Sequence, residues 1–278
     1  MSCIVQNDTE IDLVQALLSN TEIQGCEECL EGKKTKLLVY FSDEAEAGRA
    51  AKIVNDQLPN TDLQITLIPP DDWLKEWRKT MKPAKLTEGI WASPDWLPPE
   101  LAPDDLWIKI EPEMVFGTGH HESTQLASQC MVRLKEQIQN GWFLDVGTGS
   151  GILCFLAEKL GAAYSLGVEL DISCLNNVIT NWTQNRPGKL MQFVFGTTDC
   201  MKQGLFFDVI ALNMIRTESL PLMDSCFRFL KPQGRCIWTG LISEDREKIK
   251  AYIQGSQWTV EREVELNDWI GFILEKRA

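Results

Sequence analysis

A glycine-rich turn between an apolar run and an amphipathic segment constrains the fold of this chain most strongly. Residues 143–161, FLDVGTGSGILCFLAEKLG, have the pattern of a strand, a tight turn and a helix. Gly147, Gly149 and Gly151 are spaced G-x-G-x-G, and glycine lets the backbone turn sharply and approach a ligand closely. In an open parallel sheet such a turn lies at the carboxyl ends of the strands, where ligands bind. The turn therefore predicts a parallel α/β sheet with a nucleotide-like ligand beside it.

Downstream of residue 120 the sequence alternates between strand and helix patterns. Strands are predicted at GWFLDV, YSLGVEL, MQFVFG, FDVIALN and GRCIWTGL, and a terminal hairpin at WTVEREVELNDWIGFILEK. Helices are predicted between them, with Ser173 as an N-cap, Gly161 as a C-cap and one helix over ESLPLMDSCFRFL. Strands that alternate with helices imply a doubly wound, mostly parallel, seven-stranded Rossmann-like sheet, covered by helices on both faces.

The first quarter of the chain has a different pattern, and 278 residues are long enough for two domains. Residues 1–69 contain a helix, a strand, a second helix and a further strand, which we interpret as a small α+β domain of split β-α-β, ferredoxin-like type. Residues 70–84 predict a linker helix, with Trp73 and Trp77 on one helical face. The larger α/β domain is then expected over residues 85–278.

Composition limits the partners of the protein. A net charge of −13 argues against non-specific binding to nucleic acid, which needs Lys and Arg to neutralise phosphates, and suits a basic protein partner. No apolar run has the length of a membrane span and no signal peptide is visible, so we expect a cytoplasmic protein. Nine cysteines, most of them in apolar runs, agree with reduced thiols. Cys26 and Cys29 form a single C-x-x-C with no second pair, so no metal site is expected there.

Two ligands compete for the glycine turn. A dinucleotide fingerprint, G-x-G-x-x-G, has its third glycine where this chain has Ile152. S-adenosylmethionine needs no phosphate cradle but needs close backbone approach, an acceptor for its ammonium group and a carboxylate for its ribose. Asp145 precedes the turn, and Glu169 ends the next strand, where a carboxylate accepts charge-assisted hydrogen bonds from ribose hydroxyls. Glu169 would serve either cofactor, so the residues favour S-adenosylmethionine and leave NAD open.

Both histidines of the chain stand side by side in FGTGHHEST, residues 116–124. On an extended segment the side chains of His120 and His121 point in opposite directions, and the chain has no further histidine to complete a metal site. We therefore expect no metal here. The two glycines of this segment allow a tightly folded loop.

These motifs together resemble a known family. FGTGHHEST, LDVGTGSGILCFLAEKLGA, GVELD and FDVIALNMI, with DDWLKEWRKTMKPAKL and IWASPDW upstream, are similar to the ribosomal protein L11 methyltransferase family (PrmA). The resemblance spans essentially the whole chain. It implies a methyltransferase sheet, S-adenosylmethionine as cofactor, and methylation of lysine side chains and the N-terminal α-amine of a large-subunit ribosomal protein. It further implies that the small domain recognises the substrate and that the linker lets it reorient.

The resemblance also assigns site residues. Thr124, Gly147, Glu169 and Asn213 match cofactor-binding positions of the family, and Asp145 and Gly149 belong to the same glycine motif. The segment that holds Phe116 and His121 resembles a loop that covers the cofactor. Where the family commonly has Asp at the ribose position, this chain has Glu169. Where it reads N-I/L-L after the asparagine, this chain reads NMIRTE, which brings the charges of Arg216 and Glu218 toward the acceptor site.

The expected reaction needs a neutral amine, and we assign its orientation to Asn213. An asparagine carbonyl at a strand end accepts hydrogen bonds from the amine without a charge that would hold it as ammonium. We expect a monomer. The alternatives are a methyltransferase of the same fold acting on another protein lysine or a small amine, a binding module without catalysis, and an NAD-dependent oxidoreductase.

Overall fold

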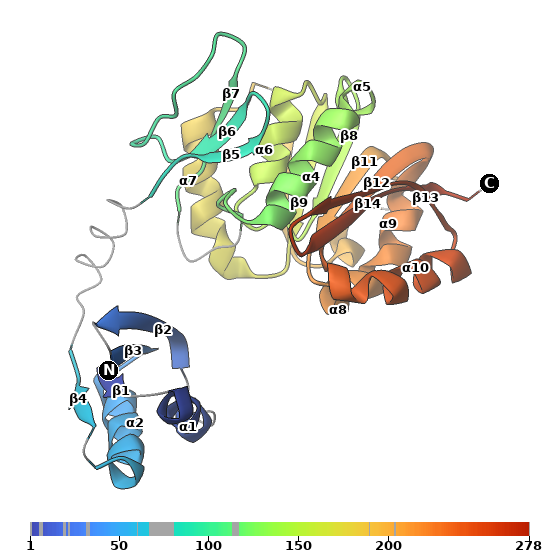
Figure 1. Cartoon of the computed structure of the whole chain (residues 1–278). Coiled ribbons are helices and arrows are strands. Elements are labelled where there is room, and N and C mark those ends of the chain that lie inside the picture. Colours follow the sequence, from blue (N-terminus) through green and yellow to red (C-terminus); the bar gives the residue numbers. More distant parts are fainter. Residues whose placement is uncertain are drawn as a thin grey trace. The chain divides into compact units, whose positions relative to one another are not determined.

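The computed structural model describes residues 2–5, 8–18, 21, 23–31, 34–59, 61–66, 81–112, 117–188, 190–202 and 204–277. The chain forms two compact units, Met1–Met81 and Lys82–Ala278, which are described separately here (Figure 1). Most of the predicted linker helix over 70–84 lies outside the described residues. Its last residue, Ala84, belongs instead to the strand β5 (Ala84–Thr87) of the larger unit.

The small unit has the order β1 (Ser2–Val5), α1 (Asp8–Leu18), β2 (Ile23–Glu31), β3 (Lys34–Phe41), α2 (Glu44–Gln57) and β4 (Asp62–Gln64). Its antiparallel sheet has the strand order β2-β3-β1-β4, which is the split β-α-β arrangement expected from the sequence. The carboxylate of Asp43 accepts from the N–H of Glu46 and caps α2. Ile11, Val14 and Leu18 of α1 pack with Leu37 and Val39 of β3 in its core.

The larger unit is built on a seven-stranded sheet. Its strands are β8 (Trp142–Val146), β9 (Tyr164–Glu169), β10 (Leu190–Phe195), β11 (Phe207–Asn213), β12 (Leu230–Ile242), β13 (Trp258–Leu266) and β14 (Trp269–Lys276). The spatial order is β10-β9-β8-β11-β12-β14-β13; the first five strands are parallel, and β14 alone is reversed, so that it runs antiparallel to both of its neighbours, β12 and β13. The prediction of a mostly parallel sheet with a terminal hairpin is confirmed. Successive strands extend in opposite directions from β8, so the carboxyl ends of β8 and β11 form the switch point where ligands bind.

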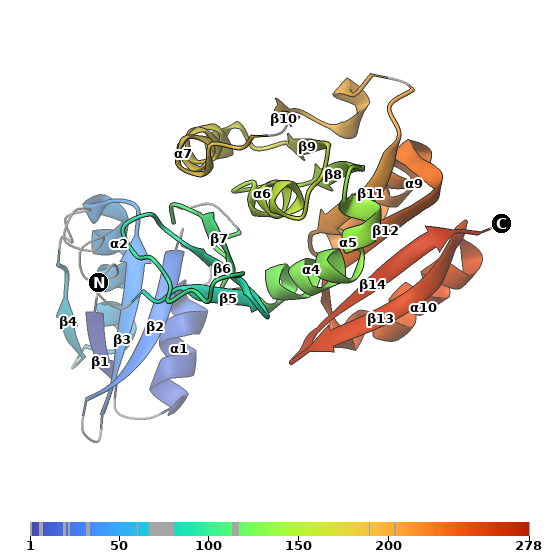
Figure 2. The ribbon, with the colours of Figure 1, turned by 90° about the horizontal axis from the view of Figure 1, so that it is seen from above.

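Helices cover both faces of this sheet (Figure 2). They are α4 (Glu122–Arg133), α5 (Lys135–Ile138), α6 (Ile152–Lys159), α7 (Leu175–Asn185), α8 (Arg216–Ser219), α9 (Met223–Phe229) and α10 (Arg246–Gly255). Alternate strand residues face opposite layers, as the pleat requires. Phe143 packs in one core with α4, α5 and α6, whereas Leu144 packs in the other with α9 and α10.

Two local predictions are corrected by the structure. The helix expected over ESLPLMDSCFRFL is divided into α8, a 3₁₀ turn at Leu220–Leu222 and α9, because Pro221 lacks an N–H to continue an α-helix. Ser173 is not an N-cap; the carboxylate of Asp171 accepts from the N–H of Ser173 and caps the turn Ile172–Cys174 that precedes α7.

A smaller sheet precedes the main one in sequence. Strands β5 (Ala84–Thr87), β6 (Ile90–Ser93) and β7 (Leu106–Lys109) lie in the order β5-β6-β7, with β6 and β7 parallel. Leu86, Ile90, Ala92 and Ile108 contribute to the core that α4 and α6 share. Among the described residues, none of the helices has the length and apolar character needed to cross a membrane.

Candidate active site

The glycine bend follows β8 and depends on conformations that favour glycine. Gly147, Gly149 and Gly151 have φ angles of 75°, 51° and 82°. The N–H groups of Gly147 and Thr148 both donate to the carbonyl of Val168 on β9, at 2.8 and 3.1 Å. A Cβ atom at Gly147 would lie 2.6 Å from the sulfur of Met214, the residue after β11. The bend therefore lies directly beside the end of β11.

Glu169 extends from the end of β9 to the same bend. Its Oε2 accepts from the N–H of Gly149 at 2.8 Å, and its Oε1 accepts from the N–H of Asp171 at 2.9 Å. Each carboxylate oxygen has a second lone pair, so both remain able to accept from a ribose hydroxyl. The extra methylene of glutamate, relative to the aspartate common in the resembling family, does not keep this carboxylate away from the bend.

Asp145 lies under the bend and is 1 % exposed. Its Oδ2 accepts from the hydroxyl of Thr148 at 2.6 Å, while its Oδ1 is buried with no hydrogen-bond partner among the described residues. The pKa of Asp145 is raised to about 7, chiefly by burial; the Thr148 hydrogen bond opposes this rise and the negative charge of Glu169 adds to it. An unpaired carboxyl oxygen in this position fits a ligand that brings a positive charge.

Asn213 ends β11 and is held from two sides. Its Nδ2 donates to the hydroxyl of Thr124 on α4 at 3.4 Å, and its Oδ1 accepts from the hydroxyl of Thr239 on β12 at 3.0 Å. Thr124 and Thr239 are fully buried. The second lone pair of the Asn213 carbonyl is left for another donor. These two hydrogen bonds fix the plane of the Asn213 amide.

The chain after Asn213 is packed against a bulge in β12. The N–H of Met214 donates to the carbonyl of Thr239 at 3.2 Å. Gly240 has φ of 80°, and a Cβ atom there would lie 2.7 Å from the backbone of Met214. The register of β12 against β14 shifts at this point. A glycine is therefore required at 240 to let the two backbones meet.

The loop of FGTGHHEST is described from Gly117 onward, and Phe116 lies outside the described residues. Gly117 and Gly119 have φ of 101° and 94°, and the hydroxyl of Ser150 donates to the carbonyl of Gly117 at 2.7 Å. This bond ties the loop to the glycine bend. A Cβ atom at Gly119 would lie 3.0 Å from Ala92 of β6, so the loop also packs closely on the small sheet.

The two histidines point to different partners, as expected from an extended segment. His120 Nε2 donates to the carbonyl of Lys82 at 2.8 Å. His121 Nδ1 accepts from the N–H of Ser123 at 3.2 Å and caps α4. The ring of His121 packs edge to face against the ring of Trp269, with 4.4 Å between the ring centroids. The N-cap role of His121 was not foreseen, because Ser, Thr, Asp and Asn are the usual caps. By capping α4, His121 supports the helix that carries Thr124.

The charges at NMIRTE are partly paired within the protein. Arg216 Nε donates to Asp245 Oδ2 at 2.8 Å, and Lys248 Nζ donates to Asp245 Oδ1 at 3.0 Å. These two hydrogen-bonded cations lower the pKa of Asp245 from its usual value. Glu218 is exposed. The departure from the family pattern therefore adds an ion pair that joins the segment after Asn213 to the start of α10.

The structure brings the predicted residues to one edge of the sheet. Hydrogen bonds join Gly149 to Glu169 and Asn213 to Thr124, and close packing joins Gly147 to the residue after Asn213. Sequence reasoning missed Thr239 and Ser150, and it missed a row of asparagines on α7. The row was visible in the sequence as asparagine at intervals of four residues.

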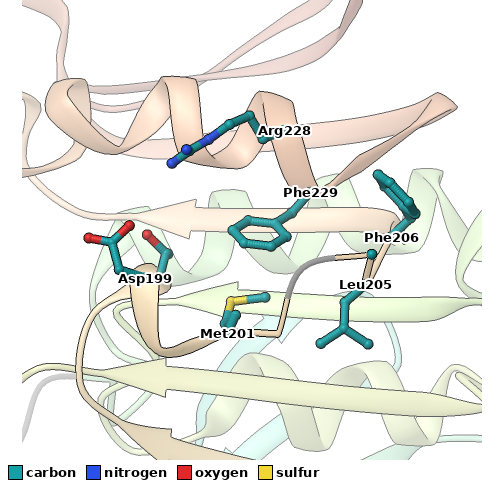
Figure 3. Close-up of a pocket in the computed structure, with 8 residues that line it drawn as sticks. Asp199, Met201, Leu205, Phe206, Arg228 and Phe229 are labelled. Carbon is teal, nitrogen blue, oxygen red and sulfur yellow. The ribbon is translucent and has the colours of Figure 1, made fainter.

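A separate pocket of about 200 Å³ lies on the α9 side of the sheet (Figure 3). Figure 3 shows Arg228 and Phe229 of α9 facing the segment after β10 that carries Asp199 and Met201. None of the predicted site residues lines this pocket. It is therefore distinct from the edge of the sheet at which the glycine bend lies.

Comparison with known proteins identifies the family. The family model described as ribosomal protein L11 methyltransferase (PrmA) matches residues 4–277. A ribosomal protein L11 methyltransferase of Halalkalibacterium halodurans is 30% identical over 237 residues, which cover 82% of this chain and 72% of that protein. One of Desulforapulum autotrophicum is 30% identical over 217 residues, covering 78% of this chain and 71% of that protein.

A solved structure shows the same fold. The crystal structure of a ribosomal protein L11 methylase from Lactobacillus delbrueckii subsp. bulgaricus superposes with a TM-score of 0.64 at 24% identity, covering 71% of this chain and all of that chain. The match of the family model to nearly every residue, and the resemblance found in the motifs, lead to one conclusion. This chain belongs to the ribosomal protein L11 methyltransferase family.

Proposed function

We propose that this protein transfers methyl groups from S-adenosylmethionine to amino groups of ribosomal protein L11, at lysine side chains and at the N-terminal α-amine. The observation that most supports this is the fixed amide of Asn213, held by Thr124 and Thr239 beside the glycine bend. The Asn213 carbonyl is an uncharged hydrogen-bond acceptor for the substrate amine, beside the place where the sulfonium of the cofactor would lie. The names of the related proteins supply the substrate.

The residues present fit the cofactor. S-adenosylmethionine carries an ammonium group, a carboxylate and a sulfonium, and it has a ribose with two hydroxyls. The glycine bend offers close approach at Gly147 and Gly149, and the carboxylate of Glu169 lies at the bend to accept from the ribose. The unpaired Oδ1 of Asp145 offers a hydrogen-bond acceptor to a cationic group, whose positive charge would favour the ionised carboxylate. Thr124 completes this set through its contact with Asn213.

When bound, the cofactor supplies an electrophilic methyl group on its sulfonium. The protein has to present a neutral amine in line with it, although only about one lysine in two thousand is neutral near pH 7. The Asn213 carbonyl accepts an N–H of the amine and aims its lone pair. The sulfonium of the bound cofactor would supply the methyl group to this nitrogen and keep the electrons of the S–C bond, and the excess proton on nitrogen would pass to water. Positioning and exclusion of water are the contributions of this chain.

The remaining assignments follow from the small unit and from charge. We assign substrate recognition to residues 1–69, with reorientation through the linker at residues 70–84. A net charge of −13 favours a basic ribosomal protein over direct contact with nucleic acid or a membrane. The protein is expected to act as a monomer in the cytoplasm. His121 and Phe116 are assigned to the loop that covers the cofactor.

The test is methyl transfer in vitro. Purified protein is incubated with isotopically labelled S-adenosylmethionine and ribosomal protein L11, and the modified amines are located by mass spectrometry. Label at lysines and the α-amine of L11 supports the proposal. Label that enters another protein from a cell extract, with none in L11, would indicate the same chemistry on another substrate. A calorimetric titration with NAD tests the oxidoreductase alternative, and NAD binding without binding of S-adenosylmethionine would overturn the proposal.

A further inference from the structure

One face of α7 carries three asparagines at intervals of four residues, Asn177, Asn181 and Asn185. Residues at this interval lie above one another on a helix. Asn177 and Asn181 are fully buried, although the burial of an amide is unfavourable unless its groups are hydrogen-bonded. The partners of these amides therefore reveal the function of the row.

The row pairs with the outer edge of β7 and with Glu111, two residues after the end of that strand. In the small sheet β7 is an edge strand, and the N–H of Ile110 points inward to the carbonyl of Ser93. The backbone groups of Lys109 and Glu111 point the other way, toward α7. Asn185 Oδ1 accepts from the N–H of Lys109 at 3.0 Å, and its Nδ2 donates to the Lys109 carbonyl at 2.6 Å.

The two buried asparagines repeat this pattern one step along the strand. Asn181 Oδ1 accepts from the N–H of Glu111 at 2.7 Å, and Asn177 Nδ2 donates to the Glu111 carbonyl at 2.8 Å. Four helical residues rise by about 6 Å. Two strand residues rise by about 6.6 Å, which nearly matches. The asparagine row thus takes the place of a neighbouring strand.

Asn181 makes one bond that its neighbours do not make. Its Nδ2 donates to the carbonyl of Ser150, in the glycine bend, at 2.9 Å, and also to Asn177 Oδ1 at 3.0 Å. Ser150 is 1 % exposed, and its hydroxyl donates to the carbonyl of Gly117 in the loop before α4. Ser150 is therefore joined to Glu111 through Asn181, and to Gly117 directly.

We propose that Asn181 is a positioning residue for the cofactor site, which holds the glycine bend and the loop before α4 at a fixed separation by anchoring Ser150 to the backbone of Glu111, just after β7. The proposal rests on the function proposed above. Asn181 is fully buried, and both hydrogens of its amide are engaged by the protein. It acts through Ser150 and not by contact with the ligand.

The energetic reason lies in the Ser150 carbonyl. Without Asn181 this buried oxygen would lose its donor, and the bend would relax to find water or another partner. The N–H of Gly149, which the carboxylate of Glu169 now accepts, would move with it. Cofactor affinity would fall even though every ligand-contacting group remained.

The experiment compares Asn181→Ala with Asn185→Ala in the full-length chain. Both remove one asparagine of the row and its bonds to β7, but only Asn181 contacts the glycine bend. S-adenosylhomocysteine is the probe, and its affinity is measured by calorimetry well below the melting temperature of each variant. We expect Asn181→Ala to weaken binding about tenfold and Asn185→Ala to leave it within about twofold, while both lower the melting temperature. Amide hydrogen exchange at Thr148–Ile152 should accelerate only in Asn181→Ala.

Two results would overturn the proposal: wild-type affinity in Asn181→Ala, or equal weakening in Asn185→Ala. If Asn181→Ala does not fold, Asn181→Asp at pH 8 is used instead, since it keeps the size of the side chain and the acceptor for Glu111 but replaces the donor to Ser150. That variant should also bind about tenfold more weakly. Wild-type protein that fails to bind the probe would instead count against the proposed function.

Discussion

The backbone N–H of Gly149 donates to Glu169 Oε2 at 2.8 Å and so joins the glycine bend to the end of the neighbouring strand. The carboxylate also accepts from the N–H of Asp171, so it is oriented by two backbone donors. An oriented carboxylate loses little side-chain freedom when a ribose binds. This orientation by two backbone donors explains how a glutamate can lie at the bend in place of the aspartate that is common in the family.

Replacement of Glu169 tests its assignment to the ribose. Glu169→Ala should weaken S-adenosylhomocysteine binding by about 1–3 kcal/mol, the scale for loss of a charge-assisted hydrogen-bonding group. Calorimetry measures the change. Asp171→Ala is the matched control, since it removes a nearby carboxylate that caps the turn after β9. Unchanged affinity in Glu169→Ala would place the ribose elsewhere.

Asn213 should affect turnover far more than cofactor affinity. Asn213→Ala removes the carbonyl to which we assign the orientation of the amine, and a misplaced nucleophile costs on the order of 10²-fold in rate. Single-turnover methylation of L11 and calorimetry with S-adenosylhomocysteine separate the two effects. Thr239→Val removes only the hydroxyl that orients the amide, so an intermediate loss is expected. Equal turnover in Asn213→Ala and wild type would remove Asn213 from the acceptor role.

The buried carboxyl of Asp145 makes stability depend on pH. Its folded-state pKa of about 7 lies above the ordinary value of 3.8, so the folded protein holds a proton that the unfolded chain releases. The wild type should therefore lose stability relative to Asp145→Asn as pH rises from about 4 to about 7, by about 2–4 kcal/mol in all. Urea unfolding at pH 5, 6, 7 and 8 measures this difference.

The control for Asp145 is Asp171→Asn, a nearby exposed acid whose pKa is lowered by hydrogen bonds from Ser173. Because that group is already ionised above about pH 4, its removal should shift the whole curve between pH 5 and 8 without changing its slope. Parallel curves for Asp145→Asn and wild type would show that Asp145 is ionised throughout this range.

Gly147 should tolerate no side chain. Gly147→Ala imposes φ of 75° on an alanine and drives its Cβ to 2.6 Å from the Met214 sulfur, which displaces the residue after Asn213. Gly204→Ala is a matched control, because Gly204 has φ of 86° but open space around it. Both variants should lose about 1–2 kcal/mol of stability to backbone strain, and only Gly147→Ala should also lose cofactor binding. Loss of binding in both, or in neither, would contradict this reading of the bend.

The sequence predicted the larger unit well because its signals are strong and local. Buried parallel strands such as FDVIALN are continuous apolar runs, and a G-x-G-x-G sequence between a strand and a helix is typical of one kind of tight turn. The strand Ser2–Val5 was missed, because a four-residue segment at the start of a chain carries no detectable periodicity. The division at Pro221 was missed because the apolar spacing continues through the proline.

The sequence predicts those residues of the candidate site that can be recognised one at a time. It does not predict contacts between residues that are far apart in sequence. Glu169 and Asn213 are recognisable from the strands that they end. The contact of Asn213 with Thr239, and that of Asn181 with Ser150, depend on how strands and helices pack. The N-cap role of His121 was missed because an imidazole can cap a helix only when one ring nitrogen is unprotonated and faces the helix N-terminus. The contact between the rings of His121 and Trp269 helps to set this orientation, and it depends on tertiary structure.

The asparagine row on α7 has a consequence for behaviour at high concentration. An exposed strand border with unsatisfied N–H and C=O groups can recruit the same border of another molecule and start amyloid-like growth. At Lys109 and Glu111 those groups are already taken by side-chain amides. A helix does not template further strands, so β-sheet growth between molecules is blocked on this side of β7.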